Sequence, residues 1–167
     1  MTHVGLLSDT HGYLDPLIFK YFKDVDEIWH AGDLGNLSVF NQLKIFKPLK
    51  AVYGNIDDQK IRVLTEERLL FDCEQIRILM THIGGRPGKY PKVIRDQLIE
   101  FKPHLFICGH SHILRVIYDK RFNTLYMNPG ACGHQGSHEI CTLIRFSIDG
   151  EWIRKAEIIE LGKRGSL

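Results

Sequence analysis

Short apolar runs that stop abruptly at polar residues recur along this chain. The first covers residues 4–7 and ends at Ser8-Asp9. It has no polar alternation, which is typical of a strand buried on both faces. Two similar runs, 27–31 and 49–53, follow after segments with helical spacing. The first third of the chain therefore predicts a β-α-β-α-β unit with parallel strands and right-handed crossovers.

The helix boundaries in this unit carry their own signals. Asp15 is placed to cap the first helix, and Pro16 suits its first position because proline lacks the N–H that a helix start leaves unpaired. Asn36 begins the second helix and Pro48 ends it.

The pattern changes after Asp58. Residues 68–72 and 75–80 flank Cys73-Glu74 and predict a hairpin, and the glycine-rich loop 84–88 separates it from a helix over 91–101. A further buried strand is predicted over residues 105–108. The remaining segments, 114–119, 124–128, 141–148 and 151–161, predict antiparallel strands, the last two joined by a hairpin turn at Asp149-Gly150, and 163–167 predicts a frayed tail.

Length and charge limit the class of protein. The 167 residues fit a single domain, 1–167, large enough to bury a core without disulfides. The 22 basic and 20 acidic residues give a net charge of +2 with no basic block, so a nucleic-acid partner or a nuclease is not favoured. No run approaches the roughly 18 apolar residues of a membrane span. Four scattered cysteines without a CxxC pair predict buried reduced thiols and a cytoplasmic location.

Polar residues at five predicted strand ends could bind metal. They are Asp9, His11, Asp33, Asn55, His82, His110 and His112. In open α/β sheets the loops at the carboxyl ends of the strands form a crevice, so these side chains should meet there. Carboxylate, amide and imidazole ligands suit Mn²⁺ first, with Fe²⁺, Zn²⁺ or Ni²⁺ as alternatives. Seven ligands are too many for one such ion and suit two ions that share a carboxylate.

The same residues give the chain a family resemblance. The segments are Asp9-Thr10-His11, Gly32-Asp33, Gly54-Asn55-Ile56-Asp57, His82 and Gly109-His110-Ser111-His112, with Asn128-Pro129-Gly130 as a further local match. In this order they resemble the calcineurin-like metallophosphoesterases, and within them the small bacterial and archaeal phosphodiesterases. The resemblance implies an α/β fold, a four-layer αββα sandwich with two mixed β-sheets and a dinuclear metal site at the strand carboxyl ends.

The resemblance also implies a ligand set and an activity. One ion would be bound by Asp9, His11, Asp33 and His112, and the other by Asp33, Asn55, His82 and His110. Asp33 would bridge the two. The expected activity is hydrolysis of a small phosphodiester or other phosphate ester by a hydroxide that bridges the metals, with Asp33, Asn55 and His82 acting through the metals.

The proton donor for the leaving group is not evident. In many larger family members a histidine follows the asparagine ligand, whereas this chain has Ile56, which cannot donate a proton. We therefore expect diesters with good leaving groups to be preferred, unless His134 or His138 supplies the acid. Both histidines lie in a glycine-rich segment and are otherwise expected to be solvated.

Other polar residues are assigned ordinary roles first. His3, His30 and His104 have no motif partner and are expected to be structural. We expect Asp58 to cap a helix and Asp57 to orient a ligand. Arg86 and Lys89 are either solvated loop cations or contacts for substrate phosphate.

A function from another class stays open. The same fold occurs as the scaffold subunit of the retromer coat, where the site is degenerate and the surface recruits partners, and fold alone does not decide between the two. The complete set of seven ligands favours the enzyme. Oligomeric state is left open by the sequence.

Overall fold

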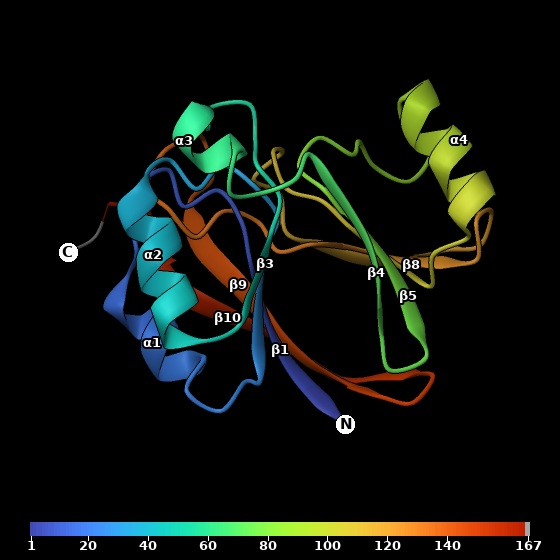
Figure 1. The fold of residues 1–167 in the computed structure, drawn as a ribbon, viewed down its shortest axis with the longest axis horizontal. Coiled ribbons are helices and arrows are strands. Elements are labelled where there is room, and N and C mark those ends of the chain that lie inside the picture. The colour runs from blue at the N-terminus through green and yellow to red at the C-terminus, as the bar shows by residue number, and fades with distance from the viewer. Residues whose placement is uncertain (166–167) are drawn as a thin grey trace.

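Two five-stranded sheets lie face to face in the computed structural model, which describes residues 1–165 (Figure 1). Sheet one has the order β10 (Trp152–Lys163), β9 (Ile140–Asp149), β1 (Thr2–Leu7), β2 (Glu27–His30) and β3 (Leu49–Ala51). Sheet two has the order β4 (Arg68–Cys73), β5 (Ile76–Thr81), β6 (Leu105–Ile107), β8 (Thr124–Asn128) and β7 (Arg115–Asp119).

Both sheets are mixed, as predicted. In sheet one, β1, β2 and β3 are parallel and β9 and β10 run against them. In sheet two, β5, β6 and β8 are parallel, and the edge strands β4 and β7 are antiparallel to their neighbours. The expectation that 124–128 is antiparallel to its neighbours is wrong for its pairing with β6. The chain reverses twice after β6, before and after β7, so β8 regains the direction of β6.

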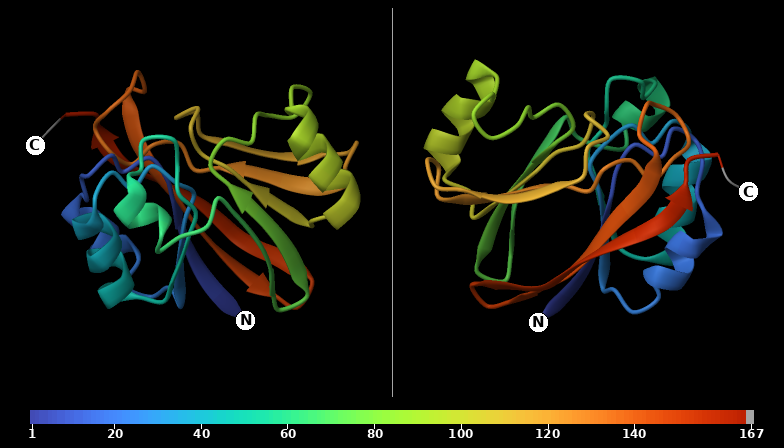
Figure 2. Two further views of the ribbon diagram at one scale, coloured as in Figure 1. Left: turned by 45° about the horizontal axis from the view of Figure 1, so that its top comes forward. Right: turned by 180° about the vertical axis from the view of Figure 1, so that it is seen from behind.

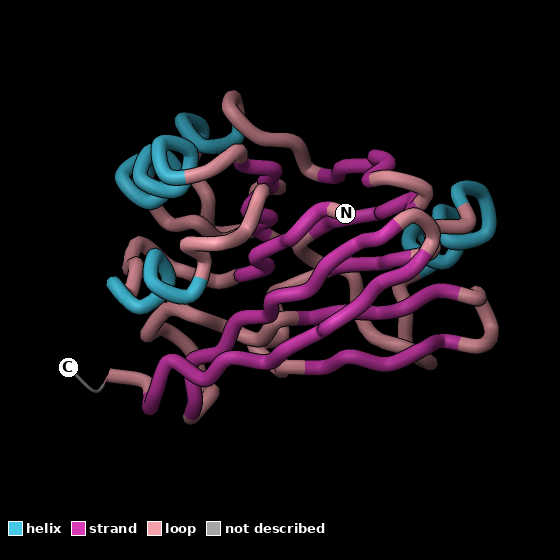
Figure 3. Tube along the Cα trace, turned by 90° about the horizontal axis from the view of Figure 1, so that it is seen from below, coloured by secondary structure: helices cyan, strands magenta, loops and turns pink. Residues whose placement is uncertain are grey.

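Helices cover the outer face of each sheet. They are α1 (Pro16–Tyr21), α2 (Leu37–Phe46), α3 (Gln59–Arg62) and α4 (Lys92–Phe101). Figures 1 and 2 show α1, α2 and α3 on the side of sheet one and α4 on the side of sheet two. Seen from below, the strands fill the middle and helices lie at both flanks (Figure 3). Within residues 1–165, no helix has the length and apolar character that a membrane crossing requires.

The predicted helix starts are confirmed by their caps. The carboxylate of Asp15 accepts a hydrogen bond from the Leu17 amide at 2.8 Å, and the side chain of Asn36 accepts one from the Val39 amide at 3.0 Å. The extent of α3 was not predicted, because four residues are too few to show a helical period. Asp58 caps it, in the role expected for that residue.

Three buried clusters fill the three spaces between the four layers. Successive residues on a strand point to opposite faces, so Leu6 packs between the sheets and Leu7 packs under the helices of sheet one. On β6, Ile107 joins the cluster between the sheets and Phe106 packs under α4. Strands buried on both faces explain the apolar runs without polar alternation.

The C-terminal strand is longer than predicted. It continues to Lys163, so the predicted tail 163–167 begins too early. Ser166 and Leu167, which belong to that prediction, lie outside the described residues. All four cysteines are buried and free, as predicted for reduced thiols.

The sheets are joined at the amino ends of their parallel strands by the tips of two hairpins. The Gln75 amide donates to the Gly150 carbonyl at 3.1 Å, and the Gly150 amide donates to Oε2 of Glu74 at 2.7 Å. At the opposite edge the sheets meet through side chains that follow the carboxyl ends of β1, β2, β5 and β6.

Candidate metal centre

Side chains that follow four parallel strands converge at one edge of the two sheets. They form two groups, Asp9, His11 and His112, and Asp33, His82 and His110, and within each group the ligand atoms all lie within 4.8 Å of one another. Residues 9 and 11 follow β1, residue 33 follows β2, residue 82 follows β5, and residues 110 and 112 follow β6. Each group therefore takes residues from both sheets, and the arrangement exists only when the sheets are packed together.

The two carboxylates lie between the groups. Oδ2 of Asp33 is 3.2 Å from Nε2 of His82 in its own group and 3.6 Å from Nε2 of His11 in the other group. Oδ1 of Asp9 is 3.1 Å from Nε2 of His112 and 3.9 Å from Nε2 of His82. Both carboxylates thus face imidazoles of both groups. Asp33 lies nearer to the imidazole of the other group, at 3.6 Å compared with 3.9 Å for Asp9.

Three atoms at the centre are buried without a hydrogen-bond partner among the described residues. They are Oδ1 of Asp9, Nε2 of His11 and Nε2 of His82. Burying a polar atom without a partner costs free energy, and such atoms are uncommon in native proteins. Here the three unpartnered atoms face one another and are of the types that bind divalent transition ions. The residues present therefore fit the metal ions that this arrangement implies.

The remaining polar atoms of these side chains are held by the protein. Oδ2 of Asp9 accepts from the Ser8 hydroxyl at 2.6 Å and from the His110 amide at 3.1 Å, and Oδ1 of Asp33 accepts from the Ile56 amide at 3.1 Å. The Ala31 carbonyl lies 2.8 Å from Nδ1 of His82. A carbonyl can only accept, so Nδ1 carries the proton, which leaves the lone pair of Nε2 directed at the centre in the neutral ring.

Asp57 joins the loops after β2 and β3. It is only 3% exposed, and its carboxylate accepts from the amides of Gly35 at 2.7 Å, Gly54 at 2.8 Å and Leu34 at 3.1 Å. Since Leu34 and Gly35 follow Asp33 and Gly54 precedes Asn55, one carboxylate fixes the spacing between two predicted ligands. These contacts agree with the orienting role expected for Asp57.

The backbone is strained where the candidate ligands lie. Five of the six converging residues have positive φ: Asp9 at 55°, His11 at 47°, Asp33 at 58°, His110 at 67° and His112 at 58°. This left-handed region is uncommon for residues other than glycine, and such residues cluster at functional sites. Backbone hydrogen bonds between the loops maintain it, including the Asp9 amide to the Gly32 carbonyl at 2.9 Å and the His11 amide to the Asp33 carbonyl at 3.0 Å.

Close packing explains the glycine before Asn55. A Cβ atom at Gly54 would lie 1.9 Å from Oδ1 of Asp33 and 2.5 Å from its amide nitrogen. Only a residue without a side chain allows the loop after β3 to pass this close to the carboxylate.

The charges at the centre shift two pKa values in opposite directions. Burial alone would raise the pKa of Asp33, but the imidazole of His82, 3.2 Å away, outweighs it, and the pKa of the carboxyl is lowered. Burial alone would lower the pKa of His82, but the neighbouring carboxylates of Asp33 and Asp9 outweigh it, so the pKa is raised. Each residue therefore favours the charged form of the other.

His30 lies behind the centre and differs from its ligands. Its Nδ1 accepts from the Gly32 amide at 3.1 Å, and its Nε2 donates to the Thr10 hydroxyl at 3.0 Å. Burial lowers the pKa of His30 to about 4, so the ring is neutral. With both nitrogens paired, His30 has the structural role that was expected.

Comparison with known families decides what kind of protein this is. The family model of the calcineurin-like phosphoesterase superfamily domain matches residues 2–151. The chain belongs to this superfamily. A relative from Methanothermobacter thermautotrophicus, described as a probable metallophosphoesterase, is 29% identical over 166 residues, which cover 95% of this chain and 92% of the relative.

Two solved structures share the fold. One, described as a novel archaeal phosphodiesterase, has a TM-score of 0.75 and 21% identity, covering 95% of this chain and 99% of the other. The other is wild-type Vps29 from Entamoeba histolytica in complex with zinc, with a TM-score of 0.74 and 13% identity, covering 95% of this chain and 98% of that one. The phosphoesterase family implies divalent metal ions, and the two groups at the sheet edge are the candidates to hold them.

The seventh predicted ligand of this phosphoesterase lies beside the others. Asn55 is exposed and lines a cavity of about 300 Å³ together with His82, Tyr53 and Arg62. Asn55 therefore shares this cavity with His82, a member of the second group. Sequence reasoning did not single out Tyr53 or Arg62, since neither belongs to a recognisable motif.

The two loop histidines are held by other contacts. The ring of His134 stacks on Tyr13, with centroids 4.0 Å apart. His138 donates from Nε2 to the Gly133 carbonyl at 2.9 Å, and its ring centroid is 5.2 Å from that of His112. Burial lowers the pKa of His138. His138 is therefore next to the first group, whereas His134 packs on the segment after His11.

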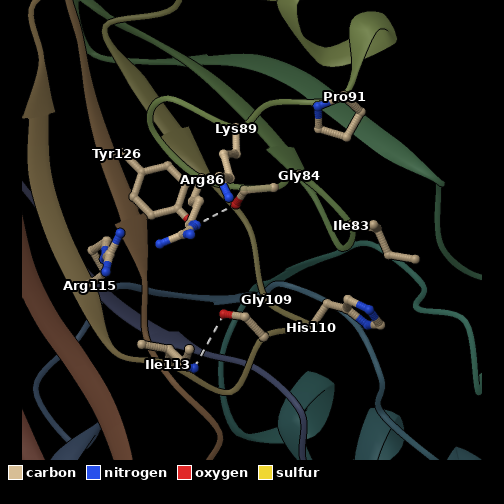
Figure 4. A pocket seen from close by; sticks show the side chains of 12 residues that line it. Ile83, Gly84, Arg86, Lys89, Pro91, Gly109, His110, Ile113, Arg115 and Tyr126 are labelled. Atoms are coloured by element: carbon tan, nitrogen blue, oxygen red, sulfur yellow. Dashed lines mark hydrogen bonds between the residues drawn. The ribbon is translucent and has the colours of Figure 1, made fainter.

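A larger cavity adjoins the second group. It has a volume of about 350 Å³ and includes Gly109 and His110 in its wall (Figure 4). Its other lining residues are Ile83, Gly84, Gly85, Arg86, Lys89, Pro91, Ser111, Ile113, Arg115 and Tyr126. The predicted Arg86 and Lys89 are among them. Arg115 and Tyr126 were not predicted, because they come from β7 and β8, where the sequence shows only strand patterns.

Proposed function

We propose that this phosphoesterase hydrolyses phosphodiesters with two divalent ions bound at the strand ends. The observation that carries the proposal is the set of three buried, unpartnered atoms on Asp9, His11 and His82 that face one another. An unpaired polar atom could be tolerated singly, but three at one point are best explained by a cation. The archaeal phosphodiesterase and the zinc complex of Vps29, which share the fold, support both parts of the proposal.

The ligand assignment follows the two groups. Asp9, His11, Asp33 and His112 would hold one ion, and Asp33, Asn55, His82 and His110 the other, with Asp33 shared. The short distances from Oδ2 of Asp33 to His82 and His11 support its shared role. Mn²⁺ is the first choice of metal, with Fe²⁺, Zn²⁺ or Ni²⁺ as alternatives, and the four free cysteines support a cytoplasmic location.

The ions, when bound, supply an activated water as nucleophile and neutralise charge on the phosphoryl oxygens. The chain contributes the geometry and the charge balance. Asp9 and Asp33 are the only carboxylates among the seven proposed ligands, so they offset only part of the ionic charge and leave a positive site that attracts an anionic phosphate. The Ile56 amide holds Oδ1 of Asp33, which leaves Oδ2 free to face both groups.

The preferred leaving group depends on whether a side chain near the centre can donate a proton to it. The side chain of Ile56 is 45% exposed and brings no proton donor. His138 already donates its Nε2 proton to Gly133, and His134 stacks on Tyr13. These contacts support a site without a poised general acid, which would hydrolyse aryl diesters faster than alkyl diesters and diesters faster than monoesters.

The test is turnover of bis(p-nitrophenyl) phosphate by protein reconstituted with Mn²⁺, before and after chelation. We expect hydrolysis that stops with the chelator and returns with added metal. A series of aryl and alkyl diesters then tests the leaving group. A flat dependence on leaving-group pKa that becomes steep in His138→Ala or His134→Ala would show that one of these histidines is the acid.

A scaffold function is the second candidate, favoured by the structural similarity to Vps29. It predicts protein partners and no turnover. Reconstituted protein that binds metal but hydrolyses none of the diesters would support the scaffold.

A further inference from the structure

The cavity next to His110 has a size suited to a small molecule. Its volume of about 350 Å³ lies within the range of roughly 300–1,000 Å³ that is typical of ligand sites. Ile83 lines both this cavity and the smaller one beside Asn55, so the two hollows adjoin each other at the metal centre. An organic group attached to a phosphate at that centre would extend into one of them.

Apolar side chains are exposed at this cavity. Ile83 is 48% exposed and Ile113 is 60% exposed, and the exposed Pro91 continues the apolar lining, while Tyr126 is only 2% exposed and lies at its base. The Tyr126 hydroxyl donates to the Gly85 carbonyl at 2.9 Å, which fixes the glycine-rich loop to β8. Covering exposed apolar surface is favourable, so the lining suits a ligand with an apolar ring.

Three cations lie on the same cavity and lack partners. Arg86, Lys89 and Arg115 line it, and within residues 1–165 none of them forms an ion pair with a carboxylate. No acidic residue lines this cavity, whereas the one beside Asn55 contains Glu67 together with Arg62. Figure 4 shows Arg86 and Arg115 on the side where Tyr126 lies, away from Ile83.

A tight turn holds two of the cations together. The Lys89 amide donates to the Arg86 carbonyl at 2.8 Å across Pro87-Gly88, and Gly88 has φ of 83°. A proline followed by a glycine with positive φ is the composition of a type II turn, which brings its first and last residues close. The turn thus places two like charges on one short loop, and a bound anion would offset their repulsion.

We propose that this cavity binds one half of the phosphodiester substrate, and that this half is a nucleoside-like group bearing a second phosphate. The ring would cover Ile83, Pro91 and Ile113, and the second phosphate would be bound by Arg86, Lys89 and Arg115. The inference rests on the proposed hydrolysis at the neighbouring metal centre and adds the substrate class to it.

Two chromogenic diesters that differ by one phosphate test the proposal. They are thymidine 5′-(p-nitrophenyl phosphate) and the same compound with a 3′-phosphate. In both, a water oxygen adds to phosphorus and releases a proton to solvent, the P–O bond to the nitrophenyl group breaks, and nitrophenolate leaves with the bonding electron pair. We expect kcat/KM to be about tenfold higher for the compound with the 3′-phosphate at low ionic strength, and the ratio to fall as salt is added, because exposed ion pairs are each worth roughly fivefold at most and are screened.

The variant that separates the outcomes is Arg86→Gln/Lys89→Gln/Arg115→Gln, whose kcat/KM ratio should fall to about one. Lys92→Gln is the matched control, since Lys92 lies three residues beyond Lys89 but is paired with Asp96 outside the cavity. It should keep the wild-type ratio. Calorimetric titration of thymidine 3′,5′-bisphosphate gives a readout independent of turnover, with binding expected in wild type and Lys92→Gln and lost in the triple variant.

Failure of the inference is distinguishable from failure of the proposed function. If wild type hydrolyses both diesters with equal kcat/KM and does not bind the bisphosphate, the substrate assignment is wrong and the hydrolase stands. If neither these diesters nor bis(p-nitrophenyl) phosphate is hydrolysed, the proposed function is wrong, and absence of bisphosphate binding would then overturn the cavity assignment as well.

Discussion

Histidines and carboxylates lie at both the carboxyl ends and the amino ends of the parallel strands, but their hydrogen bonding differs between the two ends. At the amino ends, Nδ1 of His3 lies 3.0 Å from Oδ2 of Asp26, and Nδ1 of His104 accepts from the Arg77 amide at 3.0 Å. Glu74 forms an ion pair with the terminal amine at 2.7 Å and accepts from the Gly150 amide. At the carboxyl ends, buried atoms of Asp9, His11 and His82 have no hydrogen-bond partner within residues 1–165.

The difference separates structural histidines from candidate ligands. His30 is as deeply buried as His82, yet both of its ring nitrogens are paired, whereas Nε2 of His82 lacks a hydrogen-bond partner. A histidine that stabilises a fold forms its hydrogen bonds within the fold. A histidine whose second nitrogen is held while the first faces other unpartnered ligands is arranged for a metal ion.

The largest effect is expected from Asp33, whose carboxylate faces both groups. Asp33→Asn should lower turnover of bis(p-nitrophenyl) phosphate by more than the roughly 10–100-fold that is typical for residues that only orient metal ligands. Asp26→Asn at the amino ends is the matched control and should keep wild-type turnover, because within residues 1–165 the Asp26 carboxylate pairs with His3 alone, at the surface. Equal turnover of Asp33→Asn and wild type would contradict the shared role of Asp33.

Gly54→Ala should come next. Its Cβ would overlap Oδ1 of Asp33, so the variant should lose bound metal as well as activity. Gly5→Ala is a control for steric overlap elsewhere, because its Cβ would lie 2.8 Å from the ring of Phe22 in the core under α1. We expect Gly5→Ala to lower the Tm with unchanged metal content per folded chain. Metal analysis and thermal unfolding of both variants distinguish the two kinds of overlap.

His11→Ala should have a smaller effect, because it removes one ligand from one group. We expect turnover to fall at limiting metal by less than in Asp33→Asn, and to recover in part with excess Mn²⁺. His104→Ala, at the amino end of β6, should show no such dependence on metal. A loss in His11→Ala that excess metal does not reduce at all would argue against a ligand role.

The smallest effect concerns the stability of the metal-free protein. The pKa of His30 is lowered to about 4, so as pH falls below the ordinary histidine value of about 6.5 the unfolded chain binds a proton that the folded chain rejects. The contribution of the neutral His30 ring to the free energy of unfolding is therefore fully present above about pH 6.5. It decreases progressively toward pH 4, by on the order of 2–3 kcal/mol. Urea unfolding of wild type and His30→Gln between pH 4 and 7 measures it. Parallel pH dependence of both proteins would contradict the assignment.

Much of this architecture could be predicted because its signals are local. Strands such as β1 are short apolar runs, and the caps of α1 and α2 follow from Asp15 and Asn36. The direction of β8 could not be predicted in the same way, since it depends on how many times the chain reverses after β6. Helix α3 is too short for periodicity to reveal it.

The candidate site also has parts that local sequence signals reveal and parts that they do not. Its ligand residues are recognisable because each follows a strand in a short motif, and the structure brings six of the seven into two groups. The wall of the larger cavity is not recognisable, because Arg115 and Tyr126 reach it only through the pairing of β7 with β8. The left-handed φ of residues such as Asp33 and His110 also depends on contacts between loops that are distant in sequence.

Metal stoichiometry tests the central claim most directly. Protein freed of metal, reconstituted with Mn²⁺ and passed over a desalting column should contain two ions per chain by plasma emission analysis, with a higher Tm than the metal-free form because ions that bind only the folded state stabilise it. Asp26→Asn should give the same value. A content of one ion or fewer per chain in fully reconstituted, folded protein would contradict the account of two groups that share Asp33.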